Sequence, residues 1–253
     1  MTALLQVDHL SKAFGALRAV DEVSFSLAAG EILAVIGPNG AGKTTCFNLL
    51  NGQIKPDRGR VTFAGRAITG LPPRVIWRLG VGRTFQVAPA PASLSVRETV
   101  QLALLSQRGW TRRLWTGVDR LLTGEADAVL ERVGVAELAA RRCAELAYGD
   151  AKRVDLAMAV AAQPKLLLMD EPTAGMALAE RQGLMALVTA LAREQGMAVL
   201  FVEHDMEAVF THAERVLVLN RGRVIADGAP AQVRQDARVK EVYLGAEADF
   251  APA

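Results

Sequence analysis

The chain has 253 residues, of which 51% are hydrophobic and 22% are charged, and this balance excludes a disordered protein and a small disulfide-held scaffold. Its length is sufficient to bury a substantial core, and we expect one globular chain. The 29 Lys and Arg against 27 Asp and Glu give a formal net charge of +2, too near balance for a protein that binds nucleic acid through a strongly basic surface.

The N-terminal residues and the apolar runs predict a protein without a leader peptide or a membrane span. Asp8 and His9 interrupt residues 1–14 before a long apolar run can form, and no small-residue cleavage pattern follows. Charged residues break the longest apolar stretches before they reach the roughly 18 residues that a span requires. The two cysteines, Cys46 and Cys143, form no CxxC motif, which is typical of a reducing compartment. We therefore expect a cytoplasmic protein that reaches a membrane only by docking.

Short apolar and β-branched runs near the N-terminus predict an antiparallel sheet. They cover residues 4–9, 17–27 and 60–64, with Gly, Asp and Lys between them. Residues 31–36 differ, because they form an apolar run that ends in a glycine-rich turn and is followed by a helix over residues 44–50. This order predicts a buried strand that leads into a helix.

Two later runs have the same buried character. They cover residues 165–169 and 198–202, and a helix predicted over residues 178–195 connects them, with Gly196 just beyond its end. Buried strands that alternate with helices are typical of a parallel sheet. The sequence therefore predicts a parallel α/β core.

The region between the two halves of this core contains no comparable strand. Helix-forming residues dominate residues 124–133 and 151–162, which predicts an inserted helical subdomain. Near the end, residues 215–219 and 223–226 flank a turn and predict a hairpin. We predict a single domain over residues 1–253, with an α/β core at about 1–86 and 163–245, a helical subdomain at about 87–162 and a loose tail at 246–253.

A phosphate-binding motif lies where the first buried strand meets its helix. Residues 37–44 match the pattern G-x-x-x-x-G-K-[ST], in which glycines let backbone N–H groups converge on phosphate oxygens. The start of the helix adds a favourable dipole, Lys43 reaches the outer phosphates, and the Thr44 hydroxyl can bind Mg²⁺. A glycine-rich turn with a solvated lysine is the alternative, and the flanking strand and helix argue against it. The predicted nucleotide-binding residues of this loop are Gly37, Pro38, Asn39, Gly40, Ala41, Gly42, Lys43, Thr44 and Thr45.

Two adjacent carboxylates follow the apolar run of residues 165–169. Asp170 and Glu171 point in different directions at the end of a strand, so that one can face a metal ion and the other an attacking water. Asp170 is therefore the predicted Mg²⁺ partner, and Glu171 is the predicted catalytic base. An acidic helix cap after a core strand is the alternative, which the phosphate-binding motif elsewhere in the chain disfavours.

With these two motifs, the chain resembles the ATP-binding subunits of ABC transporters. The resemblance runs from about residue 4 to residue 245. It implies a P-loop NTPase fold of the ABC type, an α/β mixed-sheet core with an N-terminal antiparallel β part and an inserted helical subdomain. It also implies that the chain binds ATP and Mg²⁺ and hydrolyses the ATP.

The resemblance extends to three single residues. Gln86 stands where the family has its Q-loop glutamine, which implies contact with Mg²⁺, with the attacking water and with the membrane subunit. His204 follows the predicted strand of residues 198–202 and resembles the catalytic switch histidine that contacts the terminal phosphate. Phe14 resembles the aromatic residue that stacks on adenine. The alternatives are an ordinary loop glutamine, a structural histidine and a core phenylalanine.

Residues 146–150, Leu-Ala-Tyr-Gly-Asp, occupy the place of the family signature LSGGQ and are called the signature segment below. They lie ahead of the second helix predicted in this region, and only Leu146 and Gly149 match the signature. The resemblance implies that Ala147 and Gly149 contact nucleotide, but Ala147 lacks the serine hydroxyl, whereas Gly149 can still offer a backbone N–H group. Residues 175–177 stand where the family has its D-loop, but they lack its acidic residue. We therefore assign them to the D-loop position and predict no chemical role for them.

Finer details resemble the ATPases of branched-chain amino acid importers. They are the strings of residues 83–86, 146–149 and 242–245. This resemblance implies import of branched-chain amino acids or related small polar solutes, with the chain peripheral on the inner face of the cell membrane. The implied partners are integral membrane permease subunits, a second ATP-binding subunit, identical or different, across the ATP sites, and indirectly a solute-binding protein, but no nucleic acid.

Three other readings of the motifs remain to be weighed. ABC-type ATPases linked to nucleic acid insert long coiled coils between the phosphate-binding loop and the signature, and here Lys43 and Gly149 are too close for that. A GTPase would carry an Asn-Lys-x-Asp motif, which the chain lacks. A catalytically weak structural nucleotide-binding subunit is the third reading, and Lys43, Glu171 and His204 together argue against it.

Overall fold

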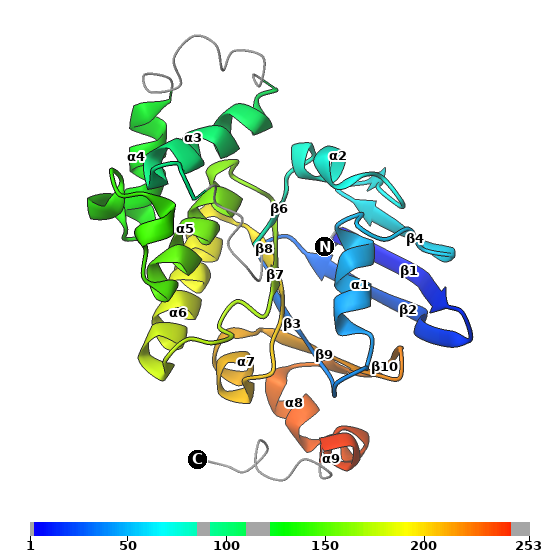
Figure 1. The fold of residues 1–253 in the computed structure, drawn as a ribbon. Coiled ribbons are helices and arrows are strands. Elements are labelled where there is room, and N and C mark those ends of the chain that lie inside the picture. Colours follow the sequence, from blue (N-terminus) through cyan, green and yellow to red (C-terminus); the bar gives the residue numbers. More distant parts are fainter. Residues whose placement is uncertain (1–2, 85–91, 110–121, 244–253) are drawn as a thin grey trace.

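The computed structural model describes residues 3–84, 92–109 and 122–243, and two sheets organise them (Figure 1). The smaller sheet is antiparallel, in the order β2-β1-β4-β5. Its strands are β1 (Ala3–Phe14), β2 (Leu17–Ala28), β4 (Arg58–Phe63) and β5 (Arg66–Ala67). Buried and exposed residues alternate along β2, as in a sheet with one face on the core. The antiparallel sheet predicted at the N-terminus is confirmed.

The larger sheet has six strands in the order β10-β9-β3-β8-β7-β6. Its strands are β3 (Ile32–Ile36), β6 (Val81–Arg83), β7 (Leu166–Asp170), β8 (Ala198–Val202), β9 (Arg215–Asn220) and β10 (Arg223–Gly228). All described pairings in this sheet are parallel except that of β9 with β10. The predicted parallel α/β core and the predicted hairpin are thus confirmed. Strand β6 is absent from the sequence prediction, because three residues carry too little hydrophobic pattern.

Both faces of the larger sheet are covered (Figure 1). One face carries helices α5 (Tyr148–Ala161), α6 (Leu178–Gln195) and α7 (Met206–His212), and the other carries α1 (Lys43–Leu50) and the smaller sheet. Side chains alternate along the central strand β3. Ile32, Ala34 and Ile36 belong to the hydrophobic cluster of the first face, whereas Leu33 and Val35 belong to that of the second. The complete burial of β3 follows from this double cover.

A group of helices extends the first hydrophobic cluster away from the sheet (Figure 1). Its described elements are α3 (Val96–Gln107), α4 (Thr123–Arg132), two 3₁₀ turns (Ala136–Leu138 and Cys143–Glu145) and α5. A capping box starts α3, in which the Ser95 hydroxyl accepts from the Glu98 N–H and the Glu98 carboxylate accepts from the Ser95 N–H. These helices agree with the helical character predicted for the region. The division into a core and a separate helical subdomain stays a prediction.

Helix α5 begins three residues earlier than the sequence pattern predicts, at Tyr148 instead of Ala151. Gly and Asp are unfavourable in helix interiors, so the pattern places Gly149 and Asp150 in a loop ahead of the helix. In the first turn, however, backbone N–H groups lack intrahelical partners in any case, and a carboxylate is favourable there. The expectation that the signature segment precedes the helix is therefore wrong, because its last three residues form the first helical turn.

The remaining helices are short, and the sequence pattern does not reveal them. They are α2 (Pro73–Arg78), α8 (Pro230–Gln235) and α9 (Ala237–Tyr243). Two of them begin with proline, whose missing N–H costs nothing at the first helical position. Within the described ranges, no helix is both long enough and apolar enough to cross a lipid bilayer.

Candidate functional site

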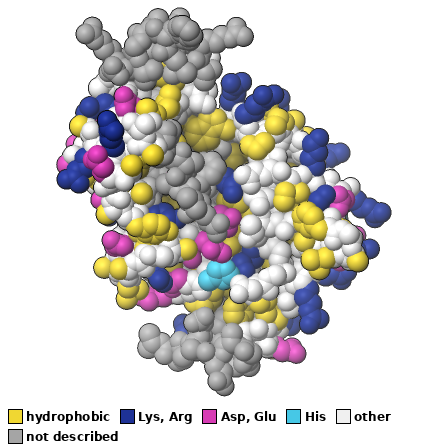
Figure 2. Space-filling view, in the orientation of Figure 1, with side chains coloured by type: hydrophobic (Ala, Val, Ile, Leu, Met, Phe, Trp, Pro, Cys, Tyr) yellow, Lys and Arg dark blue, Asp and Glu magenta, His cyan; other side chains and the backbone are white. Residues whose placement is uncertain are grey.

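The candidate site forms where three neighbouring parallel strands end. Strand β8 lies between β3 and β7, and its last residue, Val202, is level with Asp170 of β7. From these three ends the chain continues into residues 37–44, His204 and Glu171. Because the carboxyl ends of parallel strands share one edge of a sheet, the predicted loop, acids and histidine come together there. Figure 2 shows acidic side chains next to a histidine on this face of the molecule.

The loop of residues 37–44 passes so close to neighbouring strands that two of its glycines have no room for a side chain. A Cβ atom on Gly42 would lie 2.1 Å from the carbonyl oxygen of Ala19 in β2, and one on Gly37 would lie 2.2 Å from that of Leu219 in β9. Gly42 also has a φ of +98°, a left-handed conformation that favours glycine. The path of the backbone therefore requires these glycines. Of the other predicted residues in and after the loop, Ala41 is buried, and those that reach the surface are Pro38, Asn39, Gly40, Thr44 and Thr45.

Helix α1 begins at the end of this loop, and no side chain caps its N-terminus. Its N-cap is Gly42, and its first turn contains no acidic residue. The N–H groups of this turn and the helix dipole can therefore bind an anion. The buried Lys43 ammonium donates hydrogen bonds to the carbonyl oxygens of Gly37 (2.6 Å) and Pro38 (3.1 Å). Burial lowers the pKa of Lys43, and the charges of two nearby carboxylates oppose this shift.

Asp170 and Glu171 lie in different surroundings. The side chain of Asp170 is buried, burial raises the pKa of its carboxyl, and the charge of Glu171 raises it further. Its Oδ1 has no hydrogen-bond partner in the described part of the chain. Glu171 is more exposed, and its Oε1 lies 3.0 Å from Nε2 of His204. The backbone of Glu171 has a φ of +48°, and its N–H donates to the carbonyl oxygen of Val202 (2.9 Å).

A buried carboxylate that the family motifs do not mark connects two parts of the site. Glu203 follows β8 and is 3% exposed. Its Oε1 accepts hydrogen bonds from the N–H (2.8 Å) and the hydroxyl (2.7 Å) of Thr173, and its Oε2 accepts from the N–H of His204 (3.1 Å). Glu203 thus joins the segment after β7 to the residue after β8. The sequence signal that could have found it is a carboxylate at the end of an apolar strand, as at Asp170.

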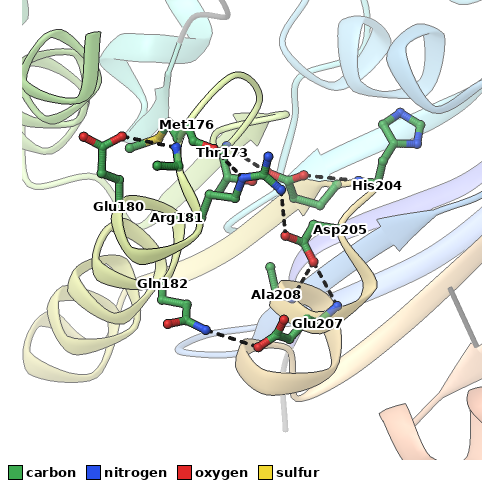
Figure 3. Close-up of polar contacts among 11 residues, drawn as sticks. Thr173, Met176, Glu180, Arg181, Gln182, His204, Asp205, Glu207 and Ala208 are labelled. Atoms are coloured by element: carbon green, nitrogen blue, oxygen red, sulfur yellow. Dashed lines mark hydrogen bonds and ion pairs between the residues drawn. The ribbon is translucent and has the colours of Figure 1, made fainter. Parts of the chain in front are cut away.

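A second set of polar contacts joins the same two segments (Figure 3). Arg181 of α6 donates from Nε to the carbonyl oxygen of Met176 (2.7 Å) and pairs through Nη1 with Oδ2 of Asp205 (3.2 Å). Asp205 is also the N-cap of α7 and accepts from two of its N–H groups. Glu171 and His204 line the adjoining cavity, which has a volume of about 560 Å³. The predicted catalytic pair therefore lies beside open space.

Phe14 and Gln86 are predicted site residues that the strand-end cluster does not include. Phe14 ends β1 and is 50% exposed, with Nζ of Lys12 lying 5.7 Å from its ring centroid. The alternative of a core phenylalanine is therefore wrong, while stacking on adenine stays a prediction. Gln86 lies outside the described residues.

The signature segment contacts other parts of its own chain. Ala147 is the N-cap of α5 and offers no side-chain cap. The Tyr148 hydroxyl donates to the carbonyl oxygen of Ala174 (2.8 Å). The Glu180 carboxylate lies so close to Gly149 that a Cβ atom there would be 3.1 Å from its Oε1. These contacts join α5 to the start of α6.

Comparison with known families agrees with this geometry. Residues 20–174, more than half of the chain, match the family model described as ABC transporter, and residues 223–249 match the model described as Branched-chain amino acid ATP-binding cassette transporter. The fold and the site define an ATP-binding cassette ATPase, and the chain belongs to the ABC transporter family. The predicted fold class and family are confirmed, while the roles of single residues stay predictions.

Individual relatives are similar over nearly the whole chain. The high-affinity branched-chain amino acid transport ATP-binding protein LivG of Salmonella typhimurium is 38% identical over 254 residues, covering 96% of this chain and 98% of that protein. The ADP conformation of MJ1267, an ATP-binding cassette of an ABC transporter, superimposes with a TM-score of 0.85 at 30% identity, covering 97% of this chain and 100% of that one. A dimeric post-hydrolysis state of the cassette MJ0796, bound to ADP and Pi, gives a TM-score of 0.76 at 25% identity, covering 89% and 98%.

Proposed function

We propose that the chain is the ATP-binding and ATP-hydrolysing subunit that powers an ABC importer for branched-chain amino acids or related small polar solutes. The observation that carries the proposal is the convergence of the open α1 N-terminus, Lys43, Asp170 and the Glu171–His204 pair at the ends of three adjacent strands. The similarity to LivG over 96% of the chain supports the solute class. The match of residues 223–249 to a branched-chain amino acid transporter model supports it independently.

ATP is held with its phosphates at the N-terminus of α1. The uncapped N–H groups of the first turn donate to phosphate oxygens. The Lys43 ammonium exchanges its two backbone carbonyl partners for phosphate oxygens, and bonds between two charged groups are the stronger ones. The exposed ring of Phe14 offers a stacking surface for adenine. The loop therefore needs little rearrangement when ATP binds.

Hydrolysis uses the Glu171–His204 pair. A water attacks the terminal phosphorus while the Glu171 carboxylate takes its proton, and the bond to the ADP oxygen breaks. The 3.0 Å contact with His204 holds the Glu171 carboxylate at the strand ends, and His204 itself reaches the terminal phosphate. For Gln86, the third predicted catalytic residue, the family resemblance implies a role toward the same water and Mg²⁺, and this residue lies outside the described ranges.

The oxygen donors at the site suit Mg²⁺. The buried Oδ1 of Asp170, which lacks a partner among the described residues, and the hydroxyl of Thr44 are the hard donors that this ion prefers. Among the described residues, no three His, Cys, Asp or Glu side chains form a group that could hold a metal by themselves. Mg²⁺ in nucleotide sites is generally held by one or two protein oxygens together with water molecules and substrate phosphates. When bound, Mg²⁺ neutralises charge that develops on the phosphates.

The proposed partners are membrane permease subunits and a second ATP-binding subunit, a copy or a different chain, across the ATP sites. A groove of about 520 Å³ between α2 and the helices α3 and α5 offers an apolar docking surface, and Figure 2 shows hydrophobic side chains with basic ones close by in this part of the face. Residues that line it include Ile76, Trp77, Leu102, Ala103 and Met158. The dimeric state of MJ0796 supports pairing of two cassettes. The chain then lies on the inner face of the membrane, and a solute-binding protein acts on it only through the permeases.

The findings favour this function over the alternatives. The relatives are transport ATP-binding proteins, which disfavours an ATPase linked to nucleic acid. Glu171 and His204 lie in contact beside a cavity, an arrangement that a purely structural nucleotide site does not require.

Two measurements test the two parts of the proposal. Lys43→Ala should lower ATP affinity by about 1.5–3 kcal/mol, because a charge-assisted phosphate contact is lost, and equal affinity in titration calorimetry would contradict nucleotide binding at this loop. Proteoliposomes that contain the chain and its permease subunits should take up labelled leucine when ATP is present, whereas those with Glu171→Gln should not. ATP hydrolysis without uptake of any branched-chain amino acid or related small polar solute would overturn the solute class alone.

A further inference from the structure

Tyr148 contacts the segment that follows Glu171, although it stands where the LSGGQ signature has a glycine. Its hydroxyl donates to the carbonyl oxygen of Ala174 (2.8 Å). Its ring lies against Gly175, where a Cβ atom would be 3.3 Å from the hydroxyl oxygen and 3.4 Å from Cε1. The space that Gly175 leaves is therefore the space that the tyrosine uses. The tyrosine at position 148 and the glycine at position 175 thus fit each other.

The contact leads to the predicted catalytic base within two hydrogen bonds. The same Ala174 that accepts from Tyr148 donates its N–H to the carbonyl oxygen of Glu171 (3.2 Å). Two residues on, the N–H of Met176 donates to the carbonyl oxygen of Thr173 (3.1 Å). Residues 171–176 thus form a compact turn, and a shift of Ala174 moves the backbone that carries the Glu171 carboxylate.

The other side of this turn is fixed to the segment after β8. The Glu203 carboxylate accepts hydrogen bonds from Thr173 and from the N–H of His204. Arg181 donates a hydrogen bond to the carbonyl oxygen of Met176 and pairs with Asp205 (Figure 3). Charge-assisted bonds of this kind are stronger than neutral ones. The turn of residues 171–176 is therefore bonded on one side to the segment around His204. On its other side, Tyr148 joins it to the N-terminus of α5.

We propose that Tyr148 is a positioning residue for hydrolysis. Through Ala174 it sets the place of residues 171–176 and thereby the Glu171–His204 contact. This inference rests on the proposed function, since it assumes that this pair acts on ATP. It follows that the position of the α5 N-terminus controls the rate of hydrolysis, while phosphate binding at α1 stays independent of it.

The test compares kcat and KM for Mg·ATP in the purified full-length chain carrying Tyr148→Phe. This variant removes one hydroxyl and keeps the ring against Gly175 and above the Lys152 ammonium, which lies 5.6 Å from its centroid. We expect kcat to fall about 3- to 10-fold, as for the loss of one neutral hydrogen bond, with KM within twofold of the unchanged chain. Tyr243→Phe makes the same change at the other tyrosine of the chain and should leave both constants unchanged. The melting temperature of Tyr148→Phe should stay within a few degrees, because the side chain is half exposed.

A double-mutant cycle with Arg181→Gln distinguishes positioning from a separate role. If both residues act through the same turn, Tyr148→Phe should lower kcat less in the Arg181→Gln chain than alone. Strictly additive losses would overturn the proposal. A raised KM with unchanged kcat would also overturn it, because Tyr148 would then act in nucleotide binding.

The failure of this inference is separable from failure of the proposed function. If Tyr148→Phe hydrolyses ATP as fast as the unchanged chain while Glu171→Gln is inactive, the inference fails and the function stands. If the unchanged chain, with its permease partners present, neither binds nor hydrolyses ATP, both fail.

Discussion

The N-termini of α1 and α5 present opposite electrostatic surroundings to an anion. The first turn of α1 has no acidic residue, and the Lys43 ammonium lies beside it. The first turn of α5 contains Asp150, and the Glu180 carboxylate lies against Gly149. A carboxylate in the first turn of α5 repels a second negative group, whereas at α1 the Lys43 ammonium offsets the negative charges of the Asp170 and Glu171 carboxylates nearby. A phosphate is therefore favoured more at α1 than at α5.

The two regions also differ in how they are built. The phosphate-binding loop is fixed by backbone packing against β2 and β9, so only glycine fits at Gly37 and Gly42. The N-terminus of α5 is joined to the start of α6 by side chains, those of Tyr148 and Glu180.

The largest effect is expected at the catalytic pair, where both regions meet. Glu171→Gln keeps the size of the side chain and one acceptor oxygen but removes the base, so ATP hydrolysis should fall about 10²- to 10⁴-fold while ATP binding is kept. Phosphate release and nucleotide titration measure the two quantities. Glu194→Gln, on the exposed side of α6, is the matched control and should hydrolyse normally. Substantial turnover in Glu171→Gln would move the base to another residue, with His204 the next candidate.

Two glycine substitutions test whether backbone packing fixes the phosphate-binding loop. Gly42→Ala places a Cβ atom 2.1 Å from a backbone oxygen, so ATP affinity should fall more than about tenfold, since a strained or displaced loop costs several kcal/mol. Gly65→Ala, in the turn between β4 and β5, is the control, because its φ of +77° is also left-handed but its Cβ atom would meet open space. That variant should lose only about 1–2 kcal/mol of stability. Equal losses of affinity in the two variants would refute the packing argument.

Restoring residues of the family signature LSGGQ tests the N-terminus of α5. Ala147→Ser supplies a hydroxyl, and Asp150→Gln removes the carboxylate from the first turn of α5. If a second cassette binds its ATP against this helix, the double variant should raise ATP-dependent dimerisation and turnover roughly tenfold, within the range for one charge-assisted hydrogen bond. Light scattering and phosphate release measure these changes. No increase would show that the departures from the signature are neutral.

The smallest effect is expected from His212, at the end of the helix that Asp205 caps. Burial lowers the pKa of His212, and its Nδ1 lies 3.2 Å from the Thr189 hydroxyl. The unfolded chain therefore binds a proton near its ordinary pKa of about 6.5 while the folded chain does not, so folding stability should fall as the pH drops below that value. Melting temperatures at pH 7.5 and pH 5.5 should differ more for the unchanged chain than for His212→Gln. Identical pH dependence in both chains would contradict a lowered pKa of His212 in the folded chain.

Most of the larger sheet could be predicted from the sequence because its central strands β3, β7 and β8 are buried on both faces. Continuous apolar runs mark β7, over its first four residues, and β8, over all five, and the glycine-rich turn marks the end of β3. The short strand β6 and the short helices carry too few residues for a period to appear. The start of α5 was misplaced because helix propensity describes interiors, while Gly149 and Asp150 occupy a first turn.

The candidate site could be predicted where chemistry fixes the residue type. Lys43, Asp170, Glu171 and His204 come together at the strand ends as the motifs indicate. Glu203 could not be assigned from a motif, because its partners, Thr173 and the following N–H, are defined only by the neighbouring strands. The fit of a tyrosine to a glycine 27 residues later is likewise invisible until the chain folds.

The left-handed backbone at Glu171 has an evolutionary consequence. A φ of +48° costs a residue with a side chain about 1–2 kcal/mol, whereas glycine adopts it freely. A glutamate is therefore kept there against the preference of the backbone, and selection for stability alone would replace it. Descendants of this chain that no longer needed to hydrolyse ATP should drift to glycine or asparagine at this position and become more stable as they lose turnover.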